Sequence, residues 1–276
     1  MTRRPAWLAA TSSCLALLTS AALAQVPDLP DGARTHWVVA EPEEVVAYLA
    51  FDPATVRDRL PPRLRFITLE ELAAGSVHWA KDYLFRNPAK AQWGVSFLEI
   101  VRAKAFSIDG RDPDWPEHGA AALWLARVAA SDPTTDLGPG RPFLALDFWI
   151  PDRKYVAYLL QTGYYAKYGD VRLRQGPKGN WLGSVSVDGL SVAAACTPTG
   201  PVTGGVGSAG TQVIFPPRSS SATDIVRVAF AGHREQACED GSSWTLHGTH
   251  PLVSGVVLGP PSFQFGYNLV GGTYPH

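Results

Sequence analysis

The sequence is poor in charge and in cysteine, and after its first segment it has no apolar run long enough to span a membrane. Only 18% of its 276 residues are charged, and 24 Lys and Arg against 25 Asp and Glu give a net charge of -1. Without a basic surplus, the chain lacks the charge that attracts nucleic acids and anionic membranes. We therefore expect small-molecule partners, no nucleic-acid partner and no membrane partner once the first segment is removed. Whether the chain forms an oligomer is left open.

Glycine and proline are abundant, with 26 Gly and 23 Pro, and 46% of the residues are hydrophobic. Both residue types interrupt helices and suit turns between short strands, and the apolar content is sufficient for a buried core. We therefore expect an α+β fold, mainly antiparallel β, in a single domain over residues 36–276. Residues 25–35 are rich in Pro, Asp and Gly, which predicts a flexible leader before this domain.

The first 24 residues have the order of a secretory signal peptide. Two arginines precede an apolar stretch, and small residues end it at positions 22–24 with an A-x-A cleavage site. An N-terminal membrane anchor is the alternative, but hydroxyl residues at 11–13 interrupt an apolar stretch that is short for a span of about 20 residues. We therefore predict the removal of residues 1–24 and a secreted or periplasmic protein.

One of the three cysteines falls in the predicted signal peptide, which leaves Cys196 and Cys238. In an oxidising compartment two cysteines favour a disulfide, with a pair of free thiols as the open alternative. Neither cysteine lies in a CxxC motif or near a histidine at zinc-finger spacing, and His247 and His250 lack an HExxH setting. We therefore predict the Cys196–Cys238 disulfide and no metal site.

Apolar alternation bounded by Pro, Gly or Asp predicts strands along most of the chain. The predicted strands cover residues 45–51, 92–108, 120–130, 143–150, 171–173, 181–187, 190–195, 225–231, 243–247 and 263–269. Two short helices are predicted, one over residues 53–60 with Asp52 as N-cap and one over residues 151–160 with Gly163 just beyond its end. Asp188-Gly189 predicts a hairpin turn, and the Gly-, Pro- and Thr-rich residues 197–210 predict a long loop.

Lysine is scarce, with six in the chain, and one of them stands apart. Lys167 follows the second predicted helix and lies among three tyrosines, with no carboxylate before Asp170. Partial desolvation would lower the pKa of its ammonium group, as a Schiff-base nucleophile requires. The alternative is that Lys167 reaches water across a tyrosine patch. Lys154, in the first turn of the helix, is a second candidate nucleophile and otherwise a surface charge.

An ordered set of motifs follows the first predicted strand and helix. They are Leu60-Pro61-Pro62-Arg63-Leu64, Phe97-Leu98-Glu99-Ile100, an apolar strand ending at Pro151, the second helix, Tyr165-Ala166-Lys167 and Val171-Arg172-Leu173. From residue 45 to residue 187 this order resembles the acetoacetate decarboxylase-like superfamily, in which a lysine of a Phe-Pro-Lys-like segment forms an imine with a ketone. The resemblance implies a closed or nearly closed β-barrel with peripheral helices, an interior cavity and no cofactor.

The resemblance also assigns roles to two residues. Lys167 matches the imine-forming lysine, and Glu99 matches an acidic residue on an earlier strand that would transfer protons. Two positions depart from the family pattern. Tyr168 stands where the decarboxylases carry a second lysine, and Ala166 replaces the usual proline.

Two further residues are predicted to bind the substrate: Tyr165, beside the lysine, and Arg102, whose planar fork suits a carboxylate. Because strand residues 99 and 102 face opposite sides, Arg102 reaches the same site only through a bulge.

The predicted function is an exported lyase-type enzyme, a decarboxylase or an aldol-type lyase, that acts on a small keto acid through a lysine Schiff base. The alternatives are a secreted, non-enzymatic barrel that binds a keto or apolar ligand, and a β-sandwich that binds sugars through aromatic residues.

Overall fold

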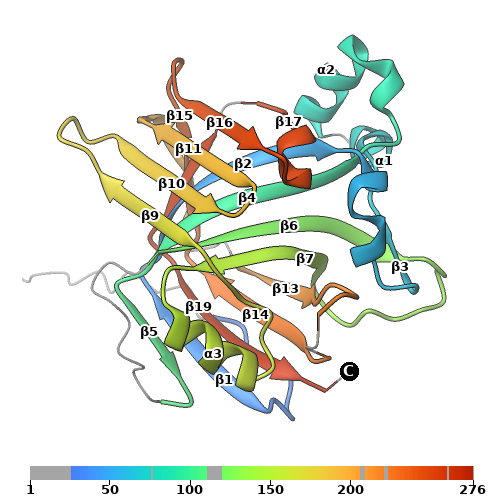
Figure 1. Cartoon of the computed structure of the whole chain (residues 1–276), viewed down its shortest axis with the longest axis vertical. Helices are drawn as coiled ribbons and strands as arrows, with labels where there is room; N and C mark the ends of the chain where they lie inside the picture. Colours follow the sequence, from blue (N-terminus) through green and yellow to red (C-terminus); the bar gives the residue numbers. More distant parts are fainter. Residues whose placement is uncertain are drawn as a thin grey trace, which may run out of the picture.

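The computed structural model describes residues 26–75, 77–110, 120–205, 209–220, 223–259 and 261–275, which Figure 1 colours along the chain. The predicted signal peptide lies outside the described residues, so its removal stays a prediction. None of the described helices is long and apolar enough to cross a membrane.

The described chain consists mainly of strands, with a few short helices. The strands are β1 (Thr35–Ala40), β2 (Glu43–Phe51), β3 (Leu64–Phe66), β4 (Gly94–Arg102), β5 (Ala105–Ile108), β6 (Ala120–Ala130), β7 (Arg141–Ile150), β8 (Lys167–Tyr168), β9 (Asp170–Gln175), β10 (Trp181–Val187), β11 (Leu190–Cys196), β12 (Pro198–Gly204), β13 (Ala209–Phe215), β14 (Ile225–Ala231), β15 (Arg234–Cys238), β16 (Ser243–Gly248), β17 (Val256–Val257), β18 (Ser262–Phe265) and β19 (Asn268–Tyr274). The helices are α1 (Leu69–Ala74), α2 (His78–Arg86) and α3 (Arg153–Gln161), and the 3-10 helices are η1 (Pro53–Arg59), η2 (Pro88–Lys90) and η3 (Pro251–Ser254).

Most strands belong to one large sheet in the order β12-β15-β18-β2-β4-β6-β7-β13-β14-β19-β1-β5, with β17, β3 and β8 attached to β2, β6 and β7. A second sheet of four strands, β16-β11-β10-β9, is seen at the upper left of Figure 1. Among the described strands only β13 and β8 run parallel to their partner β7 in the large sheet. The predicted class, mainly antiparallel β with few helices, is confirmed. A closed barrel is not confirmed, because no pairing joins β12 to β5 among these strands.

Alternation along β4 sends successive side chains to the two faces of the large sheet. Leu98 and Ile100 point to the main core, which they share with Val185 of the four-stranded sheet. The other face carries a smaller core with Tyr155 and Leu159 of α3. The large sheet therefore separates the main core from the space next to α3, where the candidate site lies.

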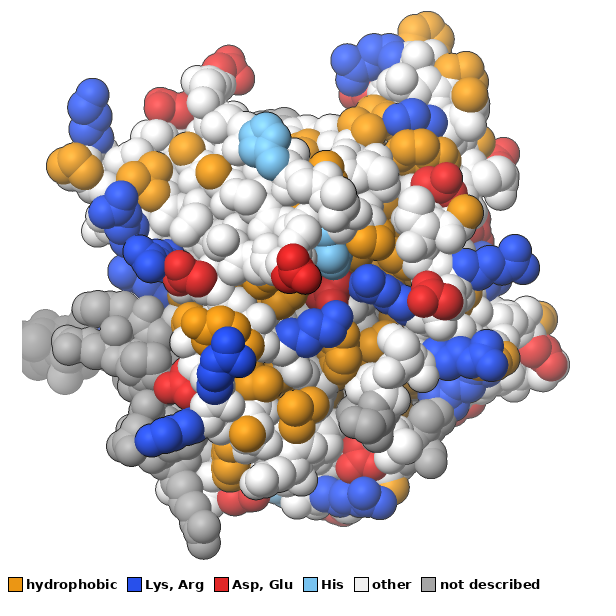
Figure 2. Space-filling model, viewed as in Figure 1, with side chains coloured by type: hydrophobic (Ala, Val, Ile, Leu, Met, Phe, Trp, Pro, Cys, Tyr) orange, Lys and Arg blue, Asp and Glu red, His pale blue; other side chains and the backbone are white. Residues whose placement is uncertain are grey.

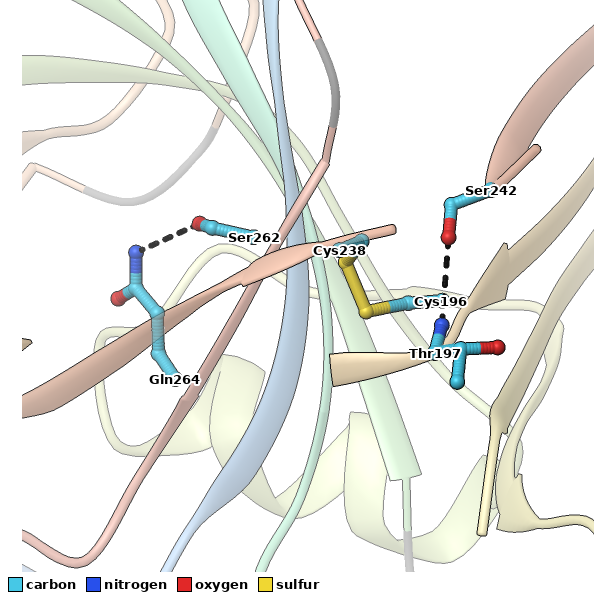
Figure 3. Close-up of a disulfide and its surroundings, with 6 residues drawn as sticks. All are labelled: Cys196, Thr197, Cys238, Ser242, Ser262 and Gln264. Atoms are coloured by element: carbon cyan, nitrogen blue, oxygen red, sulfur yellow. Dashed lines mark hydrogen bonds between the residues drawn. A yellow bond between two sulfur atoms is a disulfide. The ribbon is translucent and has the colours of Figure 1, made fainter. Parts of the chain in front are cut away.

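A disulfide links the two sheets. Cys196 ends β11 of the four-stranded sheet and Cys238 ends β15 of the large sheet, and both are buried. Figure 3 shows the bond beside Thr197, whose N–H donates to Ser242 Oγ at 3.2 Å. The disulfide predicted from the sequence is confirmed.

Local sequence signals set several element boundaries. Asp52 caps η1 by accepting the Ala54 N–H at 2.9 Å, and Asp152 caps α3 by accepting the Tyr155 N–H at 3.0 Å. Gly189 takes a φ of +72° in the turn between β10 and β11, a conformation that side chains disfavour. The two predicted helices and the predicted hairpin are confirmed, and the first helix is of the 3-10 kind.

Three predicted segments are wrong. The single strand predicted over residues 263–269 is the end of β18 and the start of β19, which are separated at Gly266, where φ is +70°. The single strand predicted over residues 92–108 is two strands, because the chain leaves the ladder at residues 103–104; β4 pairs with β2 and β6, whereas β5 pairs with β1. The loop predicted over residues 197–210 contains β12 and the start of β13. β12 lies at the edge of the large sheet and pairs only with β15, across a register shift, so its prolines and glycines are tolerated there.

The predicted leader contacts the rest of the chain. Leu29 packs against the main core, and the Pro30 carbonyl accepts a hydrogen bond from the Tyr274 hydroxyl at 2.9 Å. Arg34 pairs with Asp224 at 3.1 Å. Through these contacts the leader packs against the folded chain. The flexibility of the leader and the domain limits stay predictions.

Candidate functional site

A cavity of about 200 Å³ lies on the α3 side of the large sheet. Apolar side chains from both the sheet and α3 form most of its wall, and the described lining contains no lysine or arginine. The carboxyl, amide and phenol groups of the lining belong to Glu44, Glu99, Gln212, Asp224, Tyr155, Tyr164, Tyr165 and Tyr267. A ligand that fits this space is small and largely apolar.

Two glutamates face the cavity from neighbouring strands. Glu44 on β2 lies opposite Val101 of β4, and Val46 lies opposite Glu99, so the glutamates are diagonal neighbours on one face of the sheet. Tyr267 donates its hydroxyl to Glu44 Oε1 at 2.5 Å. Among the described residues Glu99 has no hydrogen-bond partner for its side chain, so its carboxyl is available to a ligand in the cavity.

The two carboxyls hold protons more tightly than usual. Burial raises the pKa of Glu44 to about 7, with the Tyr267 hydrogen bond opposing this shift and the charge of Glu235 adding to it. Burial also raises the pKa of Glu99 well above its usual range, and the charge of Glu44 raises it further. Two neighbouring carboxylates in apolar surroundings repel each other. Glu99 therefore keeps its proton to a higher pH than an ordinary glutamate does, which suits a proton donor.

Arg102 lies on the opposite face of β4 from Glu99. Its guanidinium binds the Glu43 carboxylate at 2.7 Å and stands 4.5 Å from the centre of the Trp181 ring. β4 runs without a bulge between positions 99 and 102, so strand alternation keeps the two side chains apart. The structure therefore does not bring Arg102 to the cavity, and its position gives no support to the predicted substrate contact.

Lys167 belongs to an ion-pair cluster around Asp147. The Asp147 side chain, on β7, is 0% exposed and accepts hydrogen bonds from Lys167 Nζ, from Arg59 Nη1 at 2.6 Å and from His250 Nε2 at 3.1 Å. We call these four residues the Asp147 cluster. It joins η1, β7, β8 and the residue that precedes η3. Figure 2 shows basic, acidic and histidine side chains meeting in the middle of one face of the molecule.

The cluster sets the charge of its members. Burial would raise the pKa of Asp147, but the His250 hydrogen bond and the charges of Arg59 and Lys167 hold it below its usual value. Burial would likewise lower the pKa of Lys167, but the charge and hydrogen bond of Asp147 outweigh it, and the pKa is raised. The predicted lowering of the Lys167 pKa is therefore wrong, because a carboxylate 20 residues away in the chain pairs with the ammonium.

His250 is held in one orientation. Its Nδ1 accepts the Leu252 N–H at 3.2 Å, which leaves the ring proton on Nε2 for the bond to Asp147. The ring meets Trp124 and Trp149 edge to face, with 5.6 and 5.7 Å between ring centres. Because both ring nitrogens are engaged, His250 orients Asp147.

Over the described ranges no group of three or more metal-ligating side chains is present.

Tyr165 connects the cavity with the Asp147 cluster. Its side chain lines the cavity, and Lys167 Nζ lies 5.2 Å from the centre of its ring. Burial raises the pKa of Tyr165, and a hydrogen bond with Lys167 opposes this shift. Lys167 is not part of the lining, and its strand partner Trp149 points to the main core. The structure thus brings Tyr165 and Lys167 together and leaves Glu99 on the other side of the sheet from Lys167.

Sequence reasoning missed most partners of these residues. Asp147 did carry a signal, since an acidic residue inside an apolar strand requires a partner when buried. Glu44 carried a similar one, because it directly precedes the apolar run of β2. No sequence signal pointed to Arg59 or His250 as a partner of Asp147. Arg59, for example, is 88 residues from Asp147 and looks like an ordinary surface residue in its own segment.

Comparison with known proteins finds likeness in structure alone. No family model matches the sequence, and no curated protein matches it. An acetoacetate decarboxylase-like enzyme from Sphingomonas wittichii RW1 superposes with a TM-score of 0.51, at 14% identity over 89% of this chain and 93% of its own. Acetoacetate decarboxylase from Legionella pneumophila superposes with a TM-score of 0.51, at 9% identity over 99% and 92%. The enduracididine biosynthesis enzyme MppR, complexed with pyruvate, has a TM-score of 0.51 at 14% identity over 89% and 91%. At these identities the likeness concerns the fold.

Proposed function

We propose that this chain, which has the acetoacetate decarboxylase-like fold, is a lyase-type enzyme that breaks a carbon–carbon bond of a small keto acid bound in the cavity. One observation carries the proposal: Glu99, with its raised pKa, faces a small apolar cavity beside Glu44. The MppR structure holds pyruvate, a small keto acid, which supports this substrate class.

Glu99 acts as the proton donor at the substrate carbonyl. When a β-keto acid loses carbon dioxide, the electrons of the breaking bond enter the carbonyl group, and its oxygen takes the Glu99 proton to give an enol. The enol becomes a ketone as a solvent proton reaches the carbon and the enol proton returns to Glu99. Aldol-type cleavage of a β-hydroxy ketone sends the electrons of the breaking bond to the same carbonyl, which takes the Glu99 proton, while the β-hydroxyl group loses its proton to water and becomes the second carbonyl.

Replacing Glu99 tests this role. Glu99→Gln keeps the size of the side chain and removes the acidic proton, so we expect kcat for carbon dioxide release from keto acids to fall roughly 10²–10⁴-fold. Glu43→Gln is the matched control, because Glu43 binds Arg102 on the other side of the sheet and should leave kcat unchanged. An unaltered kcat in Glu99→Gln would contradict the role of Glu99. A wild-type protein that binds keto acids without converting them would favour the non-enzymatic alternative.

A lysine imine is the second candidate, because Lys167 contacts Tyr165 of the cavity wall. An imine forms from the neutral amine, so Lys167 would have to leave Asp147 and lose a proton first. Borohydride reduction with a panel of keto acids, read by peptide mass spectrometry and repeated on Lys167→Ala, decides between the routes. A substrate-dependent adduct on Lys167 supports the imine, and turnover without an adduct supports the carboxyl route.

We propose that the enzyme works outside the cytoplasm. The order of residues 1–24 supports export, and the Cys196–Cys238 disulfide fits an oxidising compartment. The mass of the protein recovered from the periplasm or the medium is expected to correspond to a chain that begins at Gln25. A chain with Met1 retained in the membrane fraction would favour the anchor instead.

A further inference from the structure

The large sheet is interrupted along one edge of β7. On this edge β13 pairs with β7 as far as Leu144, and β8 pairs with it from Trp149 onward. Residues 145–148 between them have no partner strand there in the part of the chain that the structure describes, while the opposite edge of β7 pairs with β6. At about 3.3 Å per residue, this unpaired stretch is ~13 Å long. We call it the β7 gap.

The cavity extends to the β7 gap. Ala145 and Phe148, which lie within the gap, both line the cavity. Tyr165, just before β8, and Pro216, just after β13, line it as well, so both ends of the gap belong to the cavity wall. The gap and the cavity therefore share part of their walls.

Two cations stand at the gap. Arg59 Nη1 donates to the Leu146 carbonyl at 3.3 Å, in the middle of the gap, as well as to Asp147. Lys167, the first residue of β8, stands at one end. The Arg218 N–H donates to the Arg59 carbonyl at 2.8 Å and so holds η1 beside the chain that follows β13. Two cations and one carboxylate leave a net positive charge at this place.

These cations have hydrogen-bond donors to offer. Within the described ranges Arg59 bonds through Nη1 alone, which leaves Nε and Nη2 without a partner. The Lys167 side chain is 44% exposed, so its ammonium can contact a ligand while it stays paired with Asp147. The described lining of the cavity contains carboxyl groups and no cation, so it disfavours an anionic group of a ligand. The two cations at the β7 gap favour such a group there.

We propose that Arg59 and Lys167 bind the carboxylate of the keto acid at the β7 gap, while the ketone end enters the cavity that Glu99 faces. This inference rests on the proposed function and adds to it the residues that select an acid over an uncharged ketone. Lys167 then serves as a binding residue with its charge retained.

Two ligands that differ in charge test this inference. 4-Oxopentanoate and its methyl ester carry the same ketone. Neither is a β-keto acid, so neither loses carbon dioxide by the decarboxylation proposed for Glu99. Calorimetric titration of the full chain at neutral pH should give a lower Kd for the acid than for the ester. Lys167→Gln keeps a hydrogen bond to Asp147 and removes the charge, so it should raise the Kd of the acid roughly tenfold and leave that of the ester unchanged.

Two further variants complete the experiment. Lys167→Arg keeps the charge and should restore affinity for the acid, whereas Lys154→Gln, at an exposed position on α3, should change neither Kd. If Lys167→Gln raised the Kd of the acid and of the ester equally, the lysine would only support the fold. That result would overturn this inference while the proposed function stands. If neither ligand binds the wild-type protein, the proposed function fails and this inference fails with it.

Discussion

At the residue scale, Asp147 is a single buried carboxylate that three basic side chains approach. Asp147→Asn removes the anion and leaves the Arg59 side chain, which is only 18% exposed, without its counter-charge. Breaking such a buried pair from one side costs about 3–5 kcal/mol, and we expect the free energy of unfolding to fall by that amount. Urea denaturation of the variant and the wild type measures it.

An exposed pair provides the control for this measurement. Asp170 binds Arg172 at 3.0 Å with side chains that are 48% and 71% exposed. Because water screens such a pair, Asp170→Asn should cost no more than about 1 kcal/mol. Similar losses in the two variants would contradict the importance of burial at Asp147.

The Glu44–Glu99 pair makes stability depend on pH. The pKa of Glu44 rises from 4.5 to about 7 in the folded chain, so between these values the folded state binds a proton that the unfolded state has lost. The free energy of unfolding therefore falls as the pH rises through this window. Glu44→Gln removes this contribution, so the Tm of the variant relative to the wild type should increase from about pH 5 to about pH 8. Thermal denaturation at several pH values measures the difference, and parallel profiles would contradict the assignment.

At the scale of elements, the sequence was sufficient wherever one nearby residue decides the conformation. Asp52 and Asp152 cap their helices through backbone N–H groups two and three residues away, and Gly189 supplies the turn that its hairpin requires. Alternation along β4 places Glu99 and Arg102 on opposite faces, so the substrate contact predicted for Arg102 gains no support, although the same alternation was visible in the sequence. In each case the physical cause lies within a few residues of the element.

Elements that depend on distant neighbours were not predictable in this way. β12 is mostly exposed and has the composition of a loop, and its pairing with β15 is what makes it a strand. α1 went unpredicted although Thr68 and Glu71 form a capping box, a spacing that is visible in the sequence. The complete Asp147 cluster could not be predicted because its four members come from four separate segments, and the nucleophile motif around Lys167 does not indicate which distant residues pair with it.

At the scale of the whole molecule, the Cys196–Cys238 disulfide ties the two sheets together across 42 residues of chain. A cross-link that closes a loop of this size restricts the unfolded chain by the equivalent of about 4 kcal/mol. The double variant Cys196→Ala with Cys238→Ala should lower the free energy of unfolding by roughly 2–4 kcal/mol, measured in urea. Reduced wild-type protein is the matching control and should agree with the variant. A double variant as stable as the oxidised wild type would contradict the prediction.

The first and last described strands are neighbours in the large sheet. Thr35 of β1 lies opposite Thr273 of β19, and their hydroxyls meet at 2.6 Å although 238 residues separate them. β5 pairs with β1, so in the strand order of the sheet both follow β19. A ribosome makes β1 long before β19, so this side of the sheet stays unfinished until β19 has been made. Until β19 is made, one edge of β1 has no partner strand, and an unpaired strand edge is prone to pair with other chains.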